Sequence, residues 1–312
     1  SGSVKAVDDV SFEIMRGETF GVVGESGCGK STLGKTLIRL LEPTEGQIFL
    51  EDREISKLKG NDLKQMRKEA QIIFQDPSAC LNPRRTVKQI LMEPFEIHKM
   101  KGEIDVEARI MELLQLVGLD SYHLSRYPHE LSGGMRQRVM IAIALACEPK
   151  LLIADEPTTA LDVTIQAQIL ELMQELRQKL GMSIIMITHD LGVVASMCEK
   201  IAVMYAGHIV EYGTADEIFY NPCHEYTKGL IRSIPKLNVE QTERLIPIEG
   251  QPVDLLNPPA GCPFAPRCPY ARAICAAELP DFVSVGERHQ TRCFLQYEDA
   301  PADAHNPFKQ DK

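Results

Sequence analysis

The chain has 312 residues, of which 44% are hydrophobic and 25% are charged, and its formal net charge is -10. This size allows one large α/β domain with an appendage, or two modest domains. The acidic balance argues against a general nucleic-acid binder, because neutralising phosphates requires clustered Lys and Arg. The longest apolar run, Val139 to Cys147, is far below the roughly 20 residues that a membrane-spanning helix needs. A membrane role would therefore require separate membrane subunits.

The beginning of the chain predicts a strand, a glycine-rich loop and a helix in succession. Thr19 to Val23 is a short β-rich run that ends at Gly24. The helix after the glycines would carry an apolar face made of Leu33, Leu37, Leu40 and Leu41. Strand, loop and helix in this order are the context in which a glycine-rich loop binds phosphate.

The middle of the chain, roughly 82–127, lacks strand signals and contains helical stretches such as Val106 to Val117, so it indicates a helical insertion. Two continuous apolar runs follow, Leu151 to Ala154 and Ile184 to Ile187, as expected for strands buried on both faces of a parallel sheet. Between them lies an amphipathic helix with apolar residues Ile165, Ile169, Leu172, Met173, Leu176 and Leu180. Strands that alternate with helices predict βαβ units and a doubly wound sheet. No internal repeat is visible, so we expect one such unit.

The composition changes after about Ile234. An extended, linker-like stretch is marked by Pro235, Pro247, Pro252, Pro258 and Pro259. The last residues, Ala300 to Lys312, are polar and contain prolines, and we expect them to be disordered.

The loop Gly24 to Ser31 fits the P-loop (Walker A) pattern fully. Its glycines allow backbone N–H groups to turn toward phosphate oxygens, and the following helix adds its positive N-terminal end. Lys30 would reach the β- and γ-phosphates, and the Ser31 hydroxyl would bind Mg²⁺. The residues expected to bind ATP here are Gly24, Ser26, Gly27, Cys28, Gly29, Lys30, Ser31 and Thr32. A simple glycine-rich turn is the alternative interpretation.

Two adjacent acidic residues end the apolar run Leu151 to Ala154. The carboxyl end of a parallel strand is where α/β sheets bind ligands. Asp155 would therefore hold Mg²⁺, through water, and Glu156 would orient or deprotonate the attacking water. The alternative is a pair of acids that only caps a helix.

The stretch Leu131 to Arg138 resembles the signature motif of the ABC ATPase family, usually LSGGQ, with Met135 in place of the glutamine. In that family, the Ser132, Gly133 and Gly134 positions contact the γ-phosphate bound to the opposite subunit. A serine hydroxyl, flexible backbone and a helix N-terminus suit an anion. Read alone, the motif is also compatible with an ordinary serine N-cap.

Three further positions match the family in order. The resemblance implies that Gln75 senses Mg²⁺ and the attacking water, that Asp162 lies in the loop crossing the dimer interface, and that His189 contacts the γ-phosphate. A lone histidine after a strand is more often structural, but its place among six ordered motifs favours the catalytic role. The adenine-stacking aromatic residue of the family, and the first strand of its β-subdomain, would lie at or before Ser1.

The resemblance implies an α/β P-loop NTPase fold of the ABC ATPase type. It would have a RecA-like parallel core, an antiparallel β-subdomain, a helical insertion and a small cysteine-rich C-terminal extension. We expect an ATPase domain over 1–234 with its helical subdomain at about 82–131, the extension over 235–299, and the tail over 300–312.

A closer resemblance is to the ATPases of dipeptide and oligopeptide importers, through Gln75 to Pro77, Leu81 to Arg84, Asp155 to Thr164 and the tail from Asn221 through Pro263. These importers commonly use two different ATPase subunits, and the chain resembles one of them up to about Glu130 and the other from Leu131 onward. The resemblance implies an ATP-hydrolysing importer subunit, peripheral on the cytoplasmic face of the membrane. Its partners would be a second ATPase subunit, identical or different, two membrane permeases and, indirectly, an extracytoplasmic peptide-binding protein, with no nucleic acid.

Two other functional classes stay open at this stage. One is a soluble ABC ATPase that is not linked to transport, although the tandem cassettes or long coiled-coil insertion usual in that class are missing from this sequence. The other is an iron–sulfur redox protein with a regulatory ATPase domain.

Four late cysteines form the pattern C-x₅-C-x₆-C-x₁₇-C, from Cys262 through Cys268 and Cys275 to Cys293. With no export signal the thiols are expected to stay reduced, which favours a metal site over disulfides. Four thiolates suit Zn²⁺ or an iron–sulfur cluster, and the wide spacing favours a [4Fe–4S] cluster over the close pairs of zinc sites. The importer subfamily also includes members with such a cluster. Zinc and four unligated thiols remain the alternatives. Nothing in the sequence links these cysteines to the ATP loop, which favours a structural role.

Overall fold

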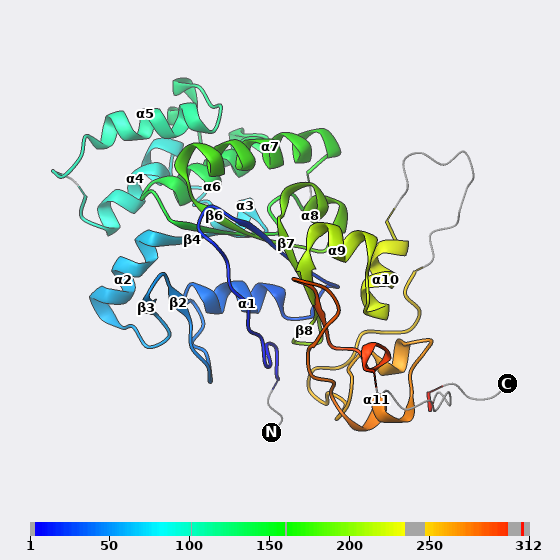
Figure 1. Ribbon diagram of the computed structural model, residues 1–312. Helices are drawn as coiled ribbons and strands as arrows, with labels where there is room; N and C mark the ends of the chain where they lie inside the picture. The colour runs from blue at the N-terminus through cyan, green and yellow to red at the C-terminus, as the bar shows by residue number, and fades with distance from the viewer. Residues whose placement is uncertain (1–3, 101, 160, 235–246, 299–306, 309–312) are drawn as a thin grey trace. The chain divides into compact units, whose positions relative to one another are not determined.

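The computed structural model describes residues 4–100, 102–159, 161–234, 247–298 and 307–308 (Figure 1). These residues form two compact units. Unit 1 comprises Ser1–Glu13, Phe20–Leu33 and Thr188–Lys312, and unit 2 comprises Ile14–Thr19 and Gly34–Ile187. Of the predicted segments, the start of the proline-marked stretch and most of the predicted tail lie outside the described residues.

Unit 2 contains a parallel sheet of three strands in the order β4-β5-β6. These strands are β4 (Ala70–Ile73), β5 (Leu151–Asp155) and β6 (Ser183–Thr188). In the register, Leu151 pairs with Ala70 on one side and with Ser183 on the other. Every residue of β6 and all of β5 except Leu151 are buried. The two predicted apolar strands are therefore confirmed.

The helices of unit 2 include the predicted helical insertion. Between 82 and 127 the structure contains helices and no strand among the described residues. The α-helices are α2 (Gly60–Glu69), α3 (Pro77–Cys80), α4 (Val87–Ile97), α5 (Val106–Leu116), α6 (Gly133–Leu145) and α7 (Val163–Leu180), with 3₁₀ turns η1 (Ser121–Ser125) and η2 (Pro128–Glu130). Side chains of Thr86, Asp105, Ser132 and Asp162 accept hydrogen bonds from the first turns of α4, α5, α6 and α7. These N-caps explain where the helices begin.

The antiparallel β-subdomain is small in this chain. Within the described residues of unit 2 it consists of the hairpin β2 (Phe49–Leu50) and β3 (Arg53–Glu54).

The prediction for the first helix is wrong at its end. Helix α1 (Lys30–Leu37) stops before Leu40 and Leu41, which are 44% and 43% exposed. The chain turns at Arg39, which has a φ of 58° and whose buried guanidinium donates to the carbonyl oxygens of Ile55 and Ser56. This tertiary hydrogen bonding overrides the helical spacing of the leucines.

Unit 1 contains a mixed sheet in the order β1-β7-β8-β10-β9, in which β1 and β7 are parallel and the other pairs are antiparallel. Its strands are β1 (Thr19–Val23), β7 (Lys200–Tyr205), β8 (His208–Thr214), β9 (Val283–Ser284) and β10 (Gln290–Thr291). Its α-helices are α8 (Leu191–Met197), α9 (Ala215–Tyr220), α10 (Glu225–Arg232) and α11 (Ala273–Ala277), with 3₁₀ turns η3 (Ala265–Arg267) and η4 (Phe294–Gln296). The hairpin of β9 and β10 joins the C-terminal segment to β8 by pairing Thr291 with Glu211.

No helix among the described residues combines the length and the apolar character required to cross a bilayer.

Candidate active site

The P-loop of unit 1 runs from the end of β1 to the start of α1, as predicted. Gly27 and Gly29 have φ values of 79° and 108°, a backbone conformation that would be strained for a residue with a side chain. A Cβ at Gly29 would lie 1.9 Å from the carbonyl oxygen of Ala6, and one at Gly24 would lie 2.1 Å from that of Met204. The glycines are therefore required both for the backbone turn and for close packing around it.

Lys30 folds back over the P-loop. Its side chain is buried, and its Nζ donates to the carbonyl oxygens of Gly24, at 2.7 Å, and Glu25, at 2.9 Å. These acceptors are neutral carbonyl groups, so the loop holds the ammonium charge without cancelling it. A cation inside a cradle of backbone amides fits a polyphosphate.

Cys28 places a thiol in this loop, close to the ammonium group of Lys30. Its Sγ lies 3.9 Å from Lys30 Nζ, and burial raises the pKa of its thiol. The side chain is therefore neutral at physiological pH and does not offset the charge of Lys30.

Glu156 of unit 2 lies directly after β5, whose last residue is the buried Asp155. Its Oε2 accepts hydrogen bonds from Gln75 Nε2 and from Thr159 Oγ1, both at 2.9 Å. The backbone of Glu156 has a φ of 48°, uncommon for this residue type, and its N–H donates to the carbonyl oxygen of Ile187 at 2.8 Å. The structure thus brings two predicted residues, Gln75 and Glu156, together and fixes the carboxylate between two donors.

Thr159 was not predicted as part of this arrangement. It follows Glu156 by three residues, and its N–H also donates to the Glu156 carbonyl oxygen at 3.2 Å. A threonine in the turn after two acids was the signal that could have identified it.

The signature residues lie at the start of α6. Ser132 is exposed and caps the helix, with its Oγ accepting from the N–H of Met135 at 3.3 Å. A Cβ at Gly134 would lie 2.7 Å from Cγ2 of Ile165 on α7, so this glycine allows the two helices to pack closely. The N-cap interpretation is therefore confirmed.

Asp162 and His189 are both exposed. Asp162 caps α7, with its Oδ1 accepting from the N–H of Ile165 at 3.0 Å. His189 lies between β6 and α8, next to Asp190, which caps α8.

The predicted residues are thus divided between the two units. The phosphate-binding loop and His189 belong to unit 1, and the remaining predicted active-site residues belong to unit 2, which holds Gln75, Ser132, Gly133, Gly134, Asp155, Glu156 and Asp162.

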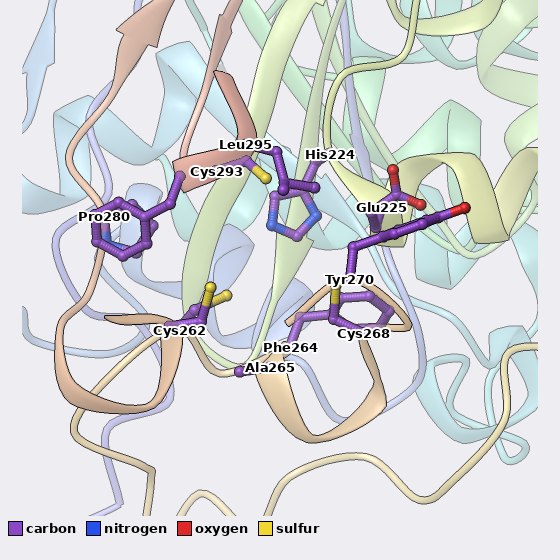
Figure 2. Close-up of a pocket in the computed structure, with 12 residues that line it drawn as sticks. His224, Glu225, Cys262, Phe264, Ala265, Cys268, Tyr270, Pro280, Cys293 and Leu295 are labelled. Carbon is purple, nitrogen blue, oxygen red and sulfur yellow. The ribbon is translucent and has the colours of Figure 1, made fainter. Parts of the chain in front are cut away.

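The four late cysteines of unit 1 line one cavity together with His224 and Phe264. Figure 2 shows Cys262, Cys268 and Cys293 around this cavity. The N–H of Cys262 donates to the carbonyl oxygen of Cys275 at 2.8 Å, which joins two of the cysteine-bearing turns. Burial raises the pKa of Cys262 and of Cys293 to about 12, and the neighbouring thiols of the cavity add to the shift. No cysteine described by the structure is in a disulfide.

Another group of potential metal ligands in unit 1 is more compact than the four late cysteines. Within the described residues, the ligand atoms of Glu211, Cys223 and His289 lie within 4.8 Å of one another, but no three of the four late cysteine sulfurs do.

The Glu211 cluster, which sequence reasoning missed, is already satisfied by hydrogen bonds. Glu211 on β8 is fully buried and accepts from the N–H groups of Cys223, at 2.6 Å, and His224, at 3.0 Å. Nε2 of His289 lies 2.7 Å from its Oε1. This cluster fastens the β9–β10 hairpin to β8 and to the start of α10.

Comparison with known proteins gives matches along the chain. A family model described as "ABC transporter" matches residues 7–159, and one described as "Oligopeptide/dipeptide transporter, C-terminal region" matches residues 210–275. The dipeptide transport ATP-binding protein DppD of Bacillus subtilis is 48% identical over 95% of this chain and 90% of its own length. The oligopeptide transport ATP-binding protein AppF of the same organism is 47% identical over 94% of this chain and 90% of its own length.

A solved structure is similar in fold. The ATP-binding cassette MJ0796, in a dimeric post-hydrolysis state bound to ADP and Pi, has a TM-score of 0.61 and 31% identity, covering 67% of this chain and 90% of that one.

Proposed function

Because this chain belongs to the ATP-binding proteins of the ABC transporter family, we propose that it binds and hydrolyses MgATP to drive the uptake of dipeptides or oligopeptides. The observation that carries the proposal is the P-loop, in which buried Lys30 donates to two neutral carbonyl oxygens and Gly27 and Gly29 have positive φ values. The relatives named for dipeptide and oligopeptide transport support the substrate class.

The proposal assigns phosphate binding, Mg²⁺ binding and activation of water to different residues. The P-loop amides and Lys30 would bind the phosphates, and Ser31, Asp155 and Gln75 would hold Mg²⁺, which would neutralise charge on the phosphates. Glu156 orients the attacking water and accepts its proton, while His189 contacts the γ-phosphate. The two hydrogen bonds that fix the Glu156 carboxylate support its role as the base.

The proposal includes a second ATPase subunit. Ser132, Gly133 and Gly134 would complete the site of the partner, and Asp162 would lie at the interface. The exposure of Ser132 and Asp162 is consistent with this arrangement, as is the dimeric state of the structurally similar cassette. The partner is either a second copy or a different ATPase, and both would dock on two membrane permeases at the cytoplasmic face. An extracytoplasmic peptide-binding protein would deliver the substrate. We also propose the boundaries 1–234, 235–299 and 300–312 for the ATPase domain, the extension and the tail.

Purification from detergent-solubilised membranes tests the transport role. Two co-purifying permease subunits are expected. Recovery of ribosomes or DNA without permeases would favour the alternative, a soluble ABC ATPase not linked to transport.

We further propose that Cys262, Cys268, Cys275 and Cys293 bind a [4Fe–4S] cluster. Tetrahedral zinc, with Zn–S bonds near 2.3 Å, places its sulfurs about 3.8 Å apart. The wide sequence intervals between these cysteines, without a close C-x₂₋₄-C pair, suit a bulkier centre. In apo protein the raised pKa values of Cys262 and Cys293 keep these two thiols neutral, so cluster binding would displace their protons.

Iron and acid-labile sulfide measured on anaerobically purified protein test the cluster. Near-equal amounts of both, lost in Cys268→Ser but kept in the control Cys80→Ser, are expected, because Cys80 is exposed on α3 and far from this segment in sequence. Stoichiometric zinc without sulfide would rule out the cluster.

A further inference from the structure

A residue of the P-loop is held by the C-terminal segment. The carboxylate of Glu25, the second residue of the loop, forms a bidentate ion pair with Arg267 of the η3 turn. Arg267 Nη1 lies 2.6 Å from Glu25 Oε2, and Arg267 Nη2 lies 3.0 Å from Glu25 Oε1. Both residues belong to unit 1. This two-pronged geometry is the strongest and most directional form of an arginine–carboxylate pair.

The guanidinium of Arg267 is itself fixed. Its side chain is 4% exposed, and its Nε donates to the carbonyl oxygen of Glu249 at 2.9 Å. Its Nη2 also donates to the Ile248 carbonyl oxygen, at 3.2 Å, and its Nη1 to the Tyr205 hydroxyl, at 3.3 Å. Because these partners restrain the arginine, the arginine can restrain the loop.

Glu25 is attached at two further points. Its N–H donates to the hydroxyl of Tyr226, at 2.7 Å, and its carbonyl oxygen accepts from Lys30 Nζ at 2.9 Å. Tyr226 is fully buried and packs against Phe264, whose ring centroid is 5.4 Å away. The side chain, the N–H and the carbonyl group of one loop residue therefore all have defined partners, two of which lie outside the loop.

The pair also has an electrostatic consequence. Glu25 would otherwise place a negative charge in the loop that receives the negatively charged phosphates. The guanidinium of Arg267 neutralises that carboxylate without competing for Lys30, which donates to the carbonyl oxygens of Gly24 and Glu25 and not to the Glu25 carboxylate. A carboxylate left without its partner at this position repels an anion, and because the Glu25 side chain is 24% exposed, solvent screens that repulsion only in part.

We propose that Arg267 is a positioning residue for ATP binding, which acts through Glu25 by anchoring the P-loop and cancelling its one acidic charge. This inference rests on the proposed function, in which the loop binds ATP. Arg267 directly precedes Cys268, so the segment that carries the cysteine cavity also holds the nucleotide loop. The sequence shows no link between the cysteines and the ATP loop, and this contact is formed only in the folded chain.

The test is a double-mutant cycle on the full chain with Arg267→Gln, Glu25→Gln and the double variant. Affinity for a fluorescent, slowly hydrolysed MgATP analogue is measured by titration. Arg267→Gln should weaken binding about tenfold, the effect of one partly screened charge worth about 1.4 kcal/mol. The double variant should recover most of that loss, because it carries no unpaired carboxylate.

Arg292→Gln is the matched control. Arg292 is a second buried arginine of the C-terminal segment, and it pairs with Asp9 at 2.5 Å, outside the loop. Its removal should leave the affinity for the ATP analogue unchanged. Steady-state kinetics should give a raised KM for Arg267→Gln with kcat changed by less than about twofold, the pattern of lost uniform binding.

Arg267→Lys covers the case in which Arg267→Gln does not fold. It keeps the charge and loses the two-pronged contact, so intermediate affinity is expected. Wild-type affinity in either variant, or a double variant as weak as Arg267→Gln, would overturn the proposal. A wild-type chain that binds no ATP would instead contradict the proposed function.

Discussion

Gln75 donates a hydrogen bond to Glu156, with 2.9 Å between Nε2 and Oε2, although the two residues are 81 positions apart and the whole helical insertion lies between them. Thr159 donates to the same carboxylate oxygen. Two neutral donors therefore bind the same oxygen, Oε2, of the Glu156 carboxylate. These hydrogen bonds fix the orientation of the carboxylate and of its second oxygen.

The Thr159 hydroxyl should contribute to hydrolysis. Thr159→Val keeps the shape of the side chain but removes one of the two donors, so kcat should fall by about 2- to 10-fold, the scale of one hydrogen bond. ATP affinity should not change. Thr164→Val, at an exposed position early in α7, is the control. Equal rates for the two variants would mean that Thr159 does not help to position Glu156.

Ser132 should matter to the partner subunit and not to nucleotide binding by its own chain. Ser132→Asp keeps an N-cap for α6 but adds a negative charge where the γ-phosphate of the partner is expected. Ser132→Asn keeps the cap without the charge and is the matched control. We expect MgATP-dependent dimers, followed by light scattering, to be lost in the first variant and retained in the second. Normal dimers of Ser132→Asp would contradict the two-chain site.

Glu211 should stabilise unit 1. In Glu211→Gln, one of the two accepting oxygens becomes an amide NH₂ group, which cannot accept the buried N–H of Cys223 or His224. The substitution also removes the carboxylate beside His289. Loss of one partner from a buried, hydrogen-bonded cluster costs about 3 kcal/mol. The thermal unfolding midpoint should fall by several degrees, while Glu287→Gln, exposed in the same hairpin, should leave it unchanged.

Removal of the proposed cluster should destabilise the extension. The segment 247–298 has only short elements among its described residues, such as α11 and the two-residue strands of its hairpin, so we expect it to need a cross-link to fold. Iron chelation under reducing conditions should increase proteolysis within 247–298 while the rest of the chain stays resistant. The variant Cys268→Ser should already be cleaved without chelator. An unchanged cleavage pattern would show that the cysteines do not staple the segment.

Local sequence signals predicted the P-loop, the strands β5 and β6 and the helices α5 and α7, because each depends on nearby residues: glycines at required turns, apolar runs and helical periodicity. The end of α1 was not predictable, since it is set by hydrogen bonds of Arg39 to residues beyond the next turn.

The contacts that join the C-terminal segment to the rest of unit 1 were also beyond sequence reasoning. Arg267 and Glu25 are 242 positions apart, and His289 and Glu211 are 78 apart. Neither the sequence around Arg267 nor that around Glu211 contains a periodicity or a motif from which the partner residue could be predicted. The four cysteines were predicted to share a site because thiols are metal ligands, a property that does not depend on the neighbouring residues. In the structure they line one cavity.

The most direct test of the account is the hydrolysis rate of Glu156→Gln measured alongside its bound nucleotide. The substitution keeps the size of the side chain and removes the basic carboxylate. Turnover should fall by roughly 10²–10⁴-fold, the contribution of a positioned base, while MgATP still binds with wild-type affinity. Glu171→Gln, exposed on α7, should behave like the wild type. Near-normal turnover by Glu156→Gln with MgATP bound would contradict the account.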